Sequence, residues 1–333
     1  MIGSIVTKDI LISTFQSVNG KIARRSVDIA AFLIWGIMTI RKKQIYYLLH
    51  DVENLTRIKN KENPKLWAIT SIIIIIVVPF AAWMSMTIPF LDECDTKILV
   101  KSLSFGFDLV PDNCYVLFFV VFIREFFVYT LRTTVTVVYV IICCSLRNAL
   151  NTHSDLGAKR ISNPNAEIGY VYFKSYLQTH ERVLSVLKSF EKTMSLPIFL
   201  IASSDFMAVM FGIVRLDPLN NLPRYEPHII KYTYAIIFIS LRGIVSFLCI
   251  STAASDVHEA SKNAKDVQKD MLKQILISGE KADIQELVHL SISHSNPPFI
   301  LSAWGAFHFT KGLYLPAFGA VLTYSLLIMQ ILK

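Results

Sequence analysis

The amino-acid sequence predicts an all-α protein that crosses a membrane several times, and two observations support this fold class. The first is composition: of 333 residues, 53% are hydrophobic and 17% are charged, and the mean hydropathy is +0.48. A soluble domain carries about a quarter charged residues. The second is that the apolar residues gather into blocks near the ~20 residues that a helix needs to cross the hydrocarbon core. The blocks are Leu66–Phe90, Cys114–Leu146, Leu196–Leu216, Ile229–Ala254 and Leu301–Leu332.

These blocks favour helices over a β-barrel, because they are continuously apolar and do not alternate with polar residues. One further segment, Val27–Ile40, is apolar but only fourteen residues long, and it contains Asp28. We interpret it as the inner part of a span whose outer part, Ile10–Val18, is weakly apolar. The expected fold is therefore a bundle of six to seven transmembrane helices, the first of them missing or degenerate.

The charged residues indicate how the helices are oriented, since short loops rich in Lys and Arg remain in the cytoplasm. Arg41–Lys65 and Arg147–Lys192 each hold seven basic residues, and Ser255–Leu290 holds five lysines. Between them, Leu91–Asn113 holds five acidic and two basic residues, and Asp217–His228 holds one basic residue. The alternation predicts that Leu91–Asn113 and Asp217–His228 are extracellular loops. After one more crossing, the C-terminus is expected to be extracellular as well.

The net charge of +8 is explained by these loops and does not indicate a nucleic-acid partner. The basic residues form no single patch, and no zinc-finger or RNP-like pattern accompanies them. Residues 1–20 include Lys8 and Asp9 and lack the continuous apolar core of a signal peptide. The expected environment is a lipid bilayer entered by internal helices.

The cysteines fit this layout. Cys94 and Cys114 share one predicted extracellular loop, where they could form a disulfide or remain unpaired thiols. Cys143, Cys144 and Cys249 fall toward the inner side and are expected to be free. No metal-ligand spacing is present, and no cofactor is expected.

Three segments are expected to form helices that pack beneath the bilayer, namely 41–65, 147–192 and 255–290. In the third, a narrow apolar stripe of coiled-coil type recurs at spacings of three and four residues. It packs either within the chain or between subunits. Its members are Val257, Ala260, Ala264, Val267 and Met271, and a shorter stripe follows at Ile284, Leu287, Val288 and Leu290.

Charged side chains within the apolar blocks are candidates for functional residues, because charges are costly in hydrocarbon. Arg124 and Glu125 lie in one block, with Arg132 two turns further on, and Asp205 and Arg242 lie in the next two. The alternative is a buried structural pair, such as Arg242 with Asp205 or with Glu125. Aromatic side chains in the outer halves suggest a small-molecule pocket, although interfacial aromatic residues also form the ordinary membrane belt. The aromatic candidates are Trp83, Phe119, Phe206, Tyr234 and Phe238.

No catalytic pattern accompanies these residues: there is no Gly-rich phosphate loop, no H-E-x-x-H and no G-x-S-x-G. We therefore do not expect an enzyme.

The C-terminal segment carries a family resemblance. Thr323 and Tyr324 are followed by five mostly apolar residues and then by Gln330 and Ile331. This order resembles the TY-(five apolar)-QF signature of arthropod gustatory receptors, with Ile331 in place of the usual Phe. The upstream spacing of Gly305, Phe307, Phe309, Gly312 and Leu313 is also similar to that family's last helix.

The resemblance implies a tastant-gated, nonselective cation channel in the plasma membrane of a sensory neuron. It would assemble as a tetramer of identical or related receptors around residues 301–333, while residues 1–300 supply the ligand-binding and cytoplasmic anchor helices. On this resemblance Gln330 faces the pore, and Leu326, Leu327 and Ile331 close it by dewetting. Thr323 and Tyr324 would anchor the pore helix to its neighbours. For Gln330 alone, an interhelical hydrogen bond is the alternative role.

Three other functions can be compared with this one. A G-protein-coupled receptor would need a cytoplasmic C-terminus, which the loop charges oppose. A secondary transporter often shows paired repeats and broken helices, and neither is apparent here. A non-conducting auxiliary subunit would share every feature above, and only a conductance measurement separates it from a channel.

Overall fold

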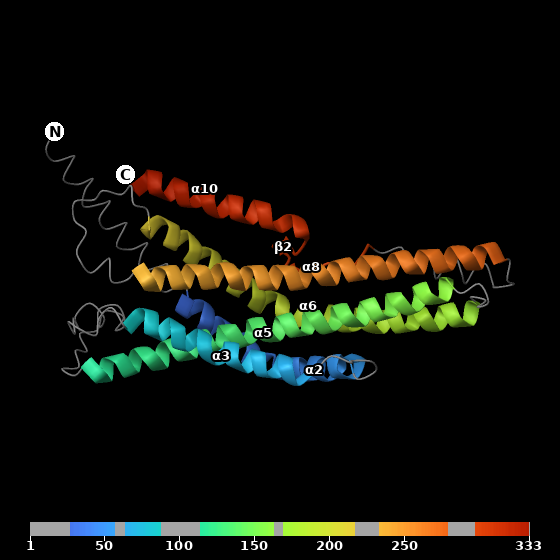
Figure 1. Cartoon of the computed structure of the whole chain (residues 1–333), viewed down its shortest axis with the longest axis horizontal. Coiled ribbons are helices and arrows are strands. Elements are labelled where there is room, and N and C mark those ends of the chain that lie inside the picture. The colour runs from blue at the N-terminus through green and yellow to red at the C-terminus, as the bar shows by residue number, and fades with distance from the viewer. Residues whose placement is uncertain are drawn as a thin grey trace.

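The computed structural model describes residues 27–56, 64–87, 114–162, 169–216, 233–278 and 297–332, and these form one elongated helical bundle (Figure 1). The helix Val27–Ile40 comes first, and the helices α2, α3, α5, α6, α8 and α10 follow. A two-stranded hairpin and a 3₁₀ turn, η2, precede α10. Their bounds are α2 Lys42–Thr56, α3 Pro64–Thr87, α5 Cys114–Ile161, α6 Tyr170–Arg215, α8 Thr233–Ser278, β1 Ser302–Ala303, β2 Phe307–His308, η2 Lys311–Leu313 and α10 Tyr314–Leu332.

Within these described residues, five helices are long and apolar enough to cross a bilayer, and Val27–Ile40 is a shorter apolar helix. The prediction of an all-α, polytopic membrane fold is confirmed. The five spanning helices correspond to the five apolar blocks of the sequence. Three of them extend far beyond their blocks, because α5, α6 and α8 contain 48, 46 and 46 residues. At about 1.5 Å per residue each is about 70 Å long, more than twice the hydrocarbon thickness.

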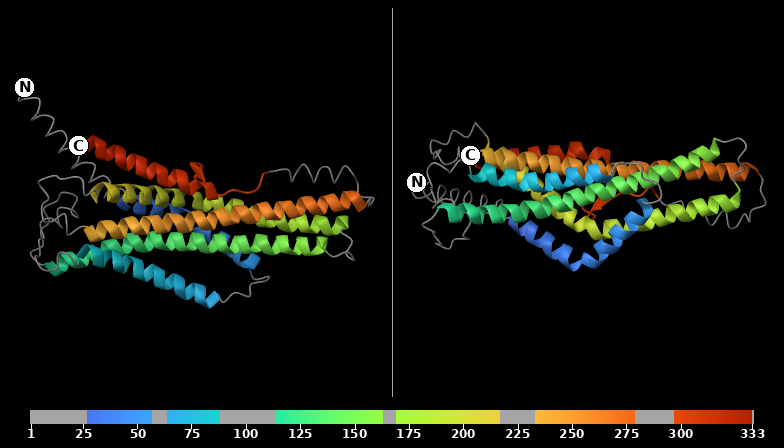
Figure 2. Two further views of the ribbon diagram at one scale, coloured as in Figure 1. Left: turned by 45° about the horizontal axis from the view of Figure 1, so that its top comes forward. Right: turned by 60° about the horizontal axis from the view of Figure 1, so that its bottom comes forward.

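Successive spanning helices run antiparallel, as the loop charges predict. Figures 1 and 2 show that the C-terminal ends of α3, α6 and α10 lie at the same end of the bundle as the N-terminal ends of α5 and α8. The acidic loop between α3 and α5 therefore leaves from the end that α10 reaches. The charge pattern predicts that this is the extracellular end.

The last spanning helix is shorter than the apolar block Leu301–Leu332, because the block begins with the β-hairpin. Ser302 pairs with His308 and Ala303 with Phe307. The turn between them is closed by a hydrogen bond from the Ala306 N–H to the Ala303 carbonyl (2.9 Å). Apolar residues of this segment are buried between helices, so hydropathy alone does not distinguish the hairpin from a helix.

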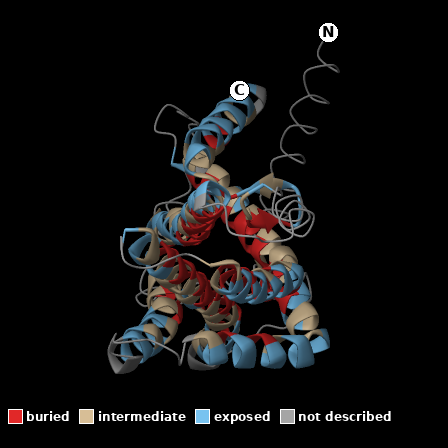
Figure 3. Ribbon diagram, turned by 90° about the vertical axis from the view of Figure 1, so that its right-hand side faces the viewer, coloured by how far each residue is buried: buried red, intermediate tan, exposed pale blue. Residues whose placement is uncertain are grey.

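The main core lies where α5, α6 and α8 pack together, and α2 and the hairpin close its sides. Viewed along the bundle, the buried faces of the helices point toward its middle (Figure 3). Val257, Ala260, Ala264 and Met271 are buried in the single chain, and Val267 is partly buried. The stripe in α8 therefore packs within the chain. The second stripe, residues 284–290, lies outside the described residues.

Two glycines let α6 and α8 approach closely. A Cβ atom on Gly212 would lie 1.9 Å from Ser240 Oγ, and one on Gly243 would lie 3.2 Å from the backbone oxygen of Asp205. Small residues at such crossings are typical of membrane helices, where close backbone approach contributes much of the packing energy. The crossing also brings Arg242, the neighbour of Gly243, next to Asp205.

Replacing Gly243 with leucine is expected to destabilise the bundle by about 1–3 kcal/mol, because the side chain would press on the α6 backbone. The matched control is Gly36→Leu, since a Cβ on Gly36 meets no atom within 4 Å. The measurement is the thermal midpoint of the detergent-solubilised protein. Equal midpoints for the two variants would show that the close crossing contributes nothing.

Candidate functional site

A buried cluster of charges lies where α5, α6 and α8 meet. Arg132 Nη2 donates a hydrogen bond to Asp205 Oδ1 at 2.6 Å, and Arg242 Nη1 donates to the same oxygen at 3.1 Å. The side chains of Arg132 and Asp205 are each 1% exposed, and that of Arg242 is 9% exposed. The Arg242 guanidinium also lies over the Tyr129 ring, 5.1 Å from its centroid, as a cation–π contact. Two arginines of two helices are thus held by one carboxylate of a third.

The sequence left two candidate structural partners for Arg242, namely Asp205 and Glu125, and the structure distinguishes them. Arg242 pairs with Asp205, which was one of the two structural pairs considered, and Arg132 joins them. Charges in a low-dielectric interior persist only when they are paired and hydrogen-bonded. Among the described residues, Asp205 Oδ2 and Arg132 Nε are buried without a hydrogen-bond partner, so the cluster retains capacity for further hydrogen bonds.

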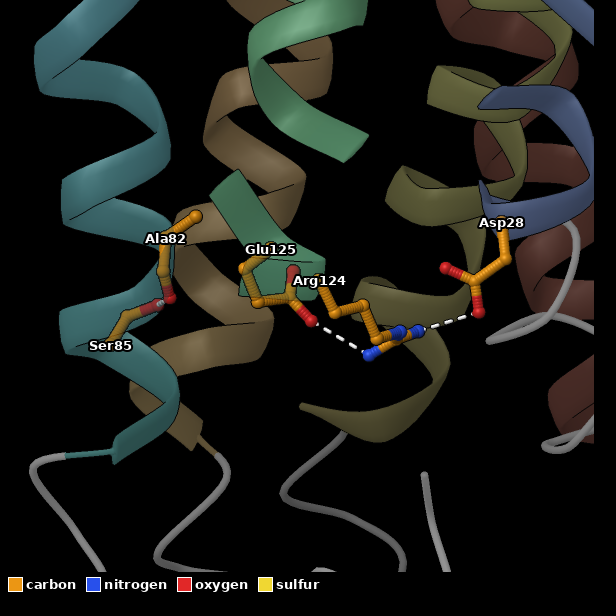
Figure 4. A network of polar contacts seen from close by, with 5 residues as sticks. All are labelled: Asp28, Ala82, Ser85, Arg124 and Glu125. Atoms are coloured by element: carbon orange, nitrogen blue, oxygen red, sulfur yellow. Dashed lines mark hydrogen bonds and ion pairs between the residues drawn. The ribbon is translucent and has the colours of Figure 1, made fainter. Parts of the chain in front are cut away.

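A second set of charges lies nearer the end of the bundle at which α5 begins, and it joins the first helix to α5. The Arg124 guanidinium bridges Asp28 Oδ2 (2.6 Å) and Glu125 Oε1 (2.7 Å), as Figure 4 shows. In the same view, Ser85 Oγ bonds only locally, to the Ala82 carbonyl of α3 (2.8 Å). Asp28, whose charge made Val27–Ile40 a poor transmembrane segment, therefore fastens that helix to the bundle.

The aromatic candidates divide into those that face other helices and those that do not. The Trp83 ring packs on Phe122 (centroids 5.3 Å apart), and its Nε1 donates to the Phe118 carbonyl at 3.4 Å. Phe206 packs against Phe247 (4.7 Å). Among the others, Phe238 is partly buried, whereas Phe119 and Tyr234 are exposed on the surface of the single chain.

Sequence reasoning did not assign roles to Tyr129, Phe122 and Phe247. For Tyr129, the spacing of residues in the sequence does carry a signal. Glu125, Tyr129 and Arg132 follow one another at spacings of four and three residues, which places them on one face of α5. On this face Tyr129 packs against Arg242 of α8, and Arg132 bonds Asp205 of α6.

The C-terminal helix α10 is attached to the bundle along one narrow side. Val321 and Ser325 are buried where α10 packs on α6, and Ser325 Oγ donates to the Val321 carbonyl at 2.7 Å. Thr323, Leu326 and Gln330 recur at spacings of three and four residues on the other side of the helix and are exposed. The neighbouring side chains of Tyr324 and Leu327 are exposed too, and the side chain of Ile331 lies outside the described residues.

Cys94 also lies outside the described residues, as does the side chain of Cys114, so the predicted bridge between them stays a prediction. Among the described cysteines, Cys143, Cys144 and Cys249 are not part of a disulfide.

Comparison with known proteins identifies the family. The family model described as 7tm chemosensory receptor matches residues 29–331. The chain belongs to this family. It is therefore a receptor and not an enzyme, and the expectation that the chain belongs to the insect type of chemosensory receptor is confirmed. A search of curated proteins finds no match to this receptor.

Solved structures show the same fold. The insect olfactory receptor OR5 from Machilis hrabei is 11% identical to this receptor, with a TM-score of 0.66 over 93% of this chain and 80% of that one. The structure of the same olfactory receptor in complex with eugenol gives 11% identity and a TM-score of 0.63, over 92% of this chain and 79% of that one. At this identity the likeness establishes the helical architecture of the receptor and not its ligand.

Substituting Asp205 with asparagine is expected to destabilise the receptor by about 3–5 kcal/mol, since it leaves two buried guanidinium groups without their carboxylate. The control is Asp28→Asn, which breaks a partly exposed ion pair and leaves Arg124 paired with Glu125, so that a smaller loss is expected. Thermal midpoints and surface expression would be compared. A smaller loss for Asp205→Asn than for Asp28→Asn would contradict a stabilising role for the buried cluster.

Proposed function

We propose that this receptor is a taste receptor that works as a ligand-gated, nonselective cation channel, a tetramer whose pore is lined by α10. The observation that carries the proposal is the exposure of α10 within the single chain. Only a narrow stripe around Val321 and Ser325 is buried, and the stripe of Thr323, Leu326 and Gln330 faces away from the bundle. Symmetric assembly around this stripe would enclose a path across the bilayer.

The residues of the second half of α10 suit a cation path. Gln330 offers a neutral amide, which can replace part of a cation's hydration without binding the ion tightly. Leu326, Leu327 and Ile331 would form the apolar constriction that closes by dewetting. Thr323 and Tyr324 would contact the neighbouring subunits, which is consistent with the exposure of both side chains in the single chain.

The ligand would bind in the outer half of the bundle, among α3, α5, α6 and α8. Phe206 and Phe247 supply apolar surface one residue from Asp205 and five from Arg242, respectively. The unpartnered Asp205 Oδ2 and Arg132 Nε could bond a polar group of a tastant. Trp83 and the bridged Arg124 and Glu125 would form the outer wall. The structural neighbour OR5 has been solved with the small phenolic molecule eugenol, which supports a small-molecule ligand.

A taste role, as opposed to smell, is supported by the TY-(five apolar)-Q order of residues 323–330. The proposed location is the plasma membrane of a sensory neuron, with the C-terminus outside the cell.

The test is whole-cell current from cells that express the full chain, with fructose, sucrose and caffeine applied as probes. Gln330→Ala is expected to change the relative permeability of Na⁺ and Ca²⁺ several-fold. Ser325→Ala is the matched control on the same helix, because Ser325 faces α6, and it should leave the permeability ratio unchanged.

An epitope tag after Lys333, stained on intact cells, reports both surface delivery and the predicted orientation. Surface protein without any evoked current would favour the auxiliary-subunit alternative. Equal effects of the two substitutions on permeability would contradict the assignment of Gln330 to the pore.

A further inference from the structure

The helix α6 contains a proline, and its consequences reach a residue far away in the sequence. Pro197 lies inside α6 and has no N–H, so the carbonyl of Thr193, four residues earlier, lacks its helical donor. Arg41 supplies one. Its Nη1 donates to the Thr193 carbonyl at 2.9 Å and to the Lys192 carbonyl at 2.7 Å.

The backbone around Arg41 and the helix that follows it hold this residue in place. It lies between the helix Val27–Ile40 and α2, where the chain changes direction, as the right-hand view of Figure 2 shows. Hydrogen bonds from the Arg41 N–H to the Ile37 carbonyl (2.9 Å) and from the Ile45 N–H to the Arg41 carbonyl (3.0 Å) fix the backbone. Leu48 and Val52 then bury α2 against the core. An arginine suits this place, because its planar group can serve two adjacent acceptors.

The β-hairpin contacts α6 on both sides of Pro197. Before the proline, Glu191 Oε1 accepts a hydrogen bond from Ser302 Oγ at 2.6 Å. After it, the Phe199 ring packs on the Trp304 ring with centroids 5.5 Å apart. A change in the angle between the two halves of α6 would therefore move these two contacts relative to each other.

The hairpin holds one residue in an unfavourable conformation at this contact. Trp304 has a φ of +52°, and the next residue, Gly305, has a φ of +71°. Glycine accepts the left-handed region freely, whereas a bulky side chain pays roughly 1–2 kcal/mol for it. Such strain persists only where surrounding contacts enforce it, and it gathers at functional positions. The Phe199 ring is the aromatic contact of Trp304 in this part of the structure.

The hairpin continues through η2 into α10, and both flanks of this connection are tied to α8. The Phe299 N–H donates to Ser261 Oγ (3.0 Å), and Lys311 forms an ion pair with Glu259. The hydroxyls of Tyr314 and Thr252 share a hydrogen bond of 2.8 Å at the first residue of α10. With its flanks fixed to α8, the hairpin links the part of α6 around Pro197 to the first turn of α10, beside the direct packing of α10 on α6 around Val321 and Ser325.

We propose that α6 bends at Pro197, that Arg41 positions this hinge by donating to the Thr193 carbonyl that the proline leaves free and to the adjacent Lys192 carbonyl, and that the hairpin transmits the bend to α10 through Trp304. Arg41 and Trp304 are positioning residues in this scheme. The consequence for gating rests on the proposed channel function. The hinge and its contact with the hairpin do not depend on it, and they are tested without a ligand or a current.

The test of the hinge is a double-mutant cycle read by hydrogen–deuterium exchange on the purified full-length protein. Arg41→Ala is expected to speed amide exchange in residues 193–201, because the freed carbonyls destabilise the adjoining turns. In the Pro197→Ala background, the restored N–H bonds the Thr193 carbonyl, and the effect of Arg41→Ala should fall to less than about half. Lys42→Ala is the control for loss of a neighbouring basic side chain.

Equal increases in exchange with and without Pro197 would overturn the assignment of Arg41 to the hinge. The cycle is informative even where a variant is less stable, because it compares Arg41→Ala between two backgrounds.

The test of transmission uses two replacements of Trp304. Trp304→Gly accepts the positive φ and preserves the turn, but removes the ring, whereas Trp304→Phe keeps an aromatic contact. Trp304→Gly should speed exchange both in residues 193–201 and in residues 311–318, since coupling between two sites is reciprocal. Trp304→Phe should restore most of the original protection at both places.

Exchange that changes only within the hairpin would show that the Trp304 contact transmits nothing, and would overturn this part of the proposal. A protein that shows the expected exchange but carries no current would retain the hinge and lose the channel function, so the two failures can be told apart.

Discussion

The fold depends on one carboxylate shared by two guanidinium groups. Asp205 lies at the point where α5, α6 and α8 cross, and it holds Arg132 and Arg242 in a region with almost no access to solvent. In such a place the cost of removing each charge from water is recovered only if all partners are present together. The three longest helices must therefore be assembled before any of these charges is stable. The glycine crossing of α6 and α8 serves the same end, because it sets the distance between Asp205 and Arg242.

The spans and their antiparallel order follow from sequence, because block hydropathy and loop charge are local quantities that the bilayer enforces. Pairing is harder to predict. Asp205 and Arg242 could be matched as the opposite charges of two neighbouring blocks. The participation of Arg132 depends on the rotation of α5, which the even distribution of apolar residues around that helix does not reveal. In the sequence, Asp28 is an unexplained charge in a short apolar segment, and the structure explains it by the ion pair with Arg124.

The C-terminal block shows a different kind of limit. Leu301, Ala303 and Phe309 are as apolar as residues of a spanning helix, but they are buried in a hairpin between α6 and α8. Hydropathy reports burial and not conformation. The stripe in α8 illustrates the same point, since its spacing predicted a packed face correctly but could not say whether the packing partner was the same chain or another. The role of Arg41 requires knowledge of a carbonyl 152 residues away.

For the proposed tetramer, the sparse attachment of α10 has a consequence for how the subunits would choose their partners. A leucine on the surface of this helix gains little by leaving lipid for a neighbouring subunit, because both surroundings are equally apolar. Discrimination between partners must then come from the few positions where backbones can approach or hydrogen bonds can form. On α10 these positions include Gly319, Thr323, Tyr324 and Gln330. In the proposed assembly, most residues of α10 could then be exchanged without loss of association, whereas a few substitutions at these positions would turn a self-association into a mixed one.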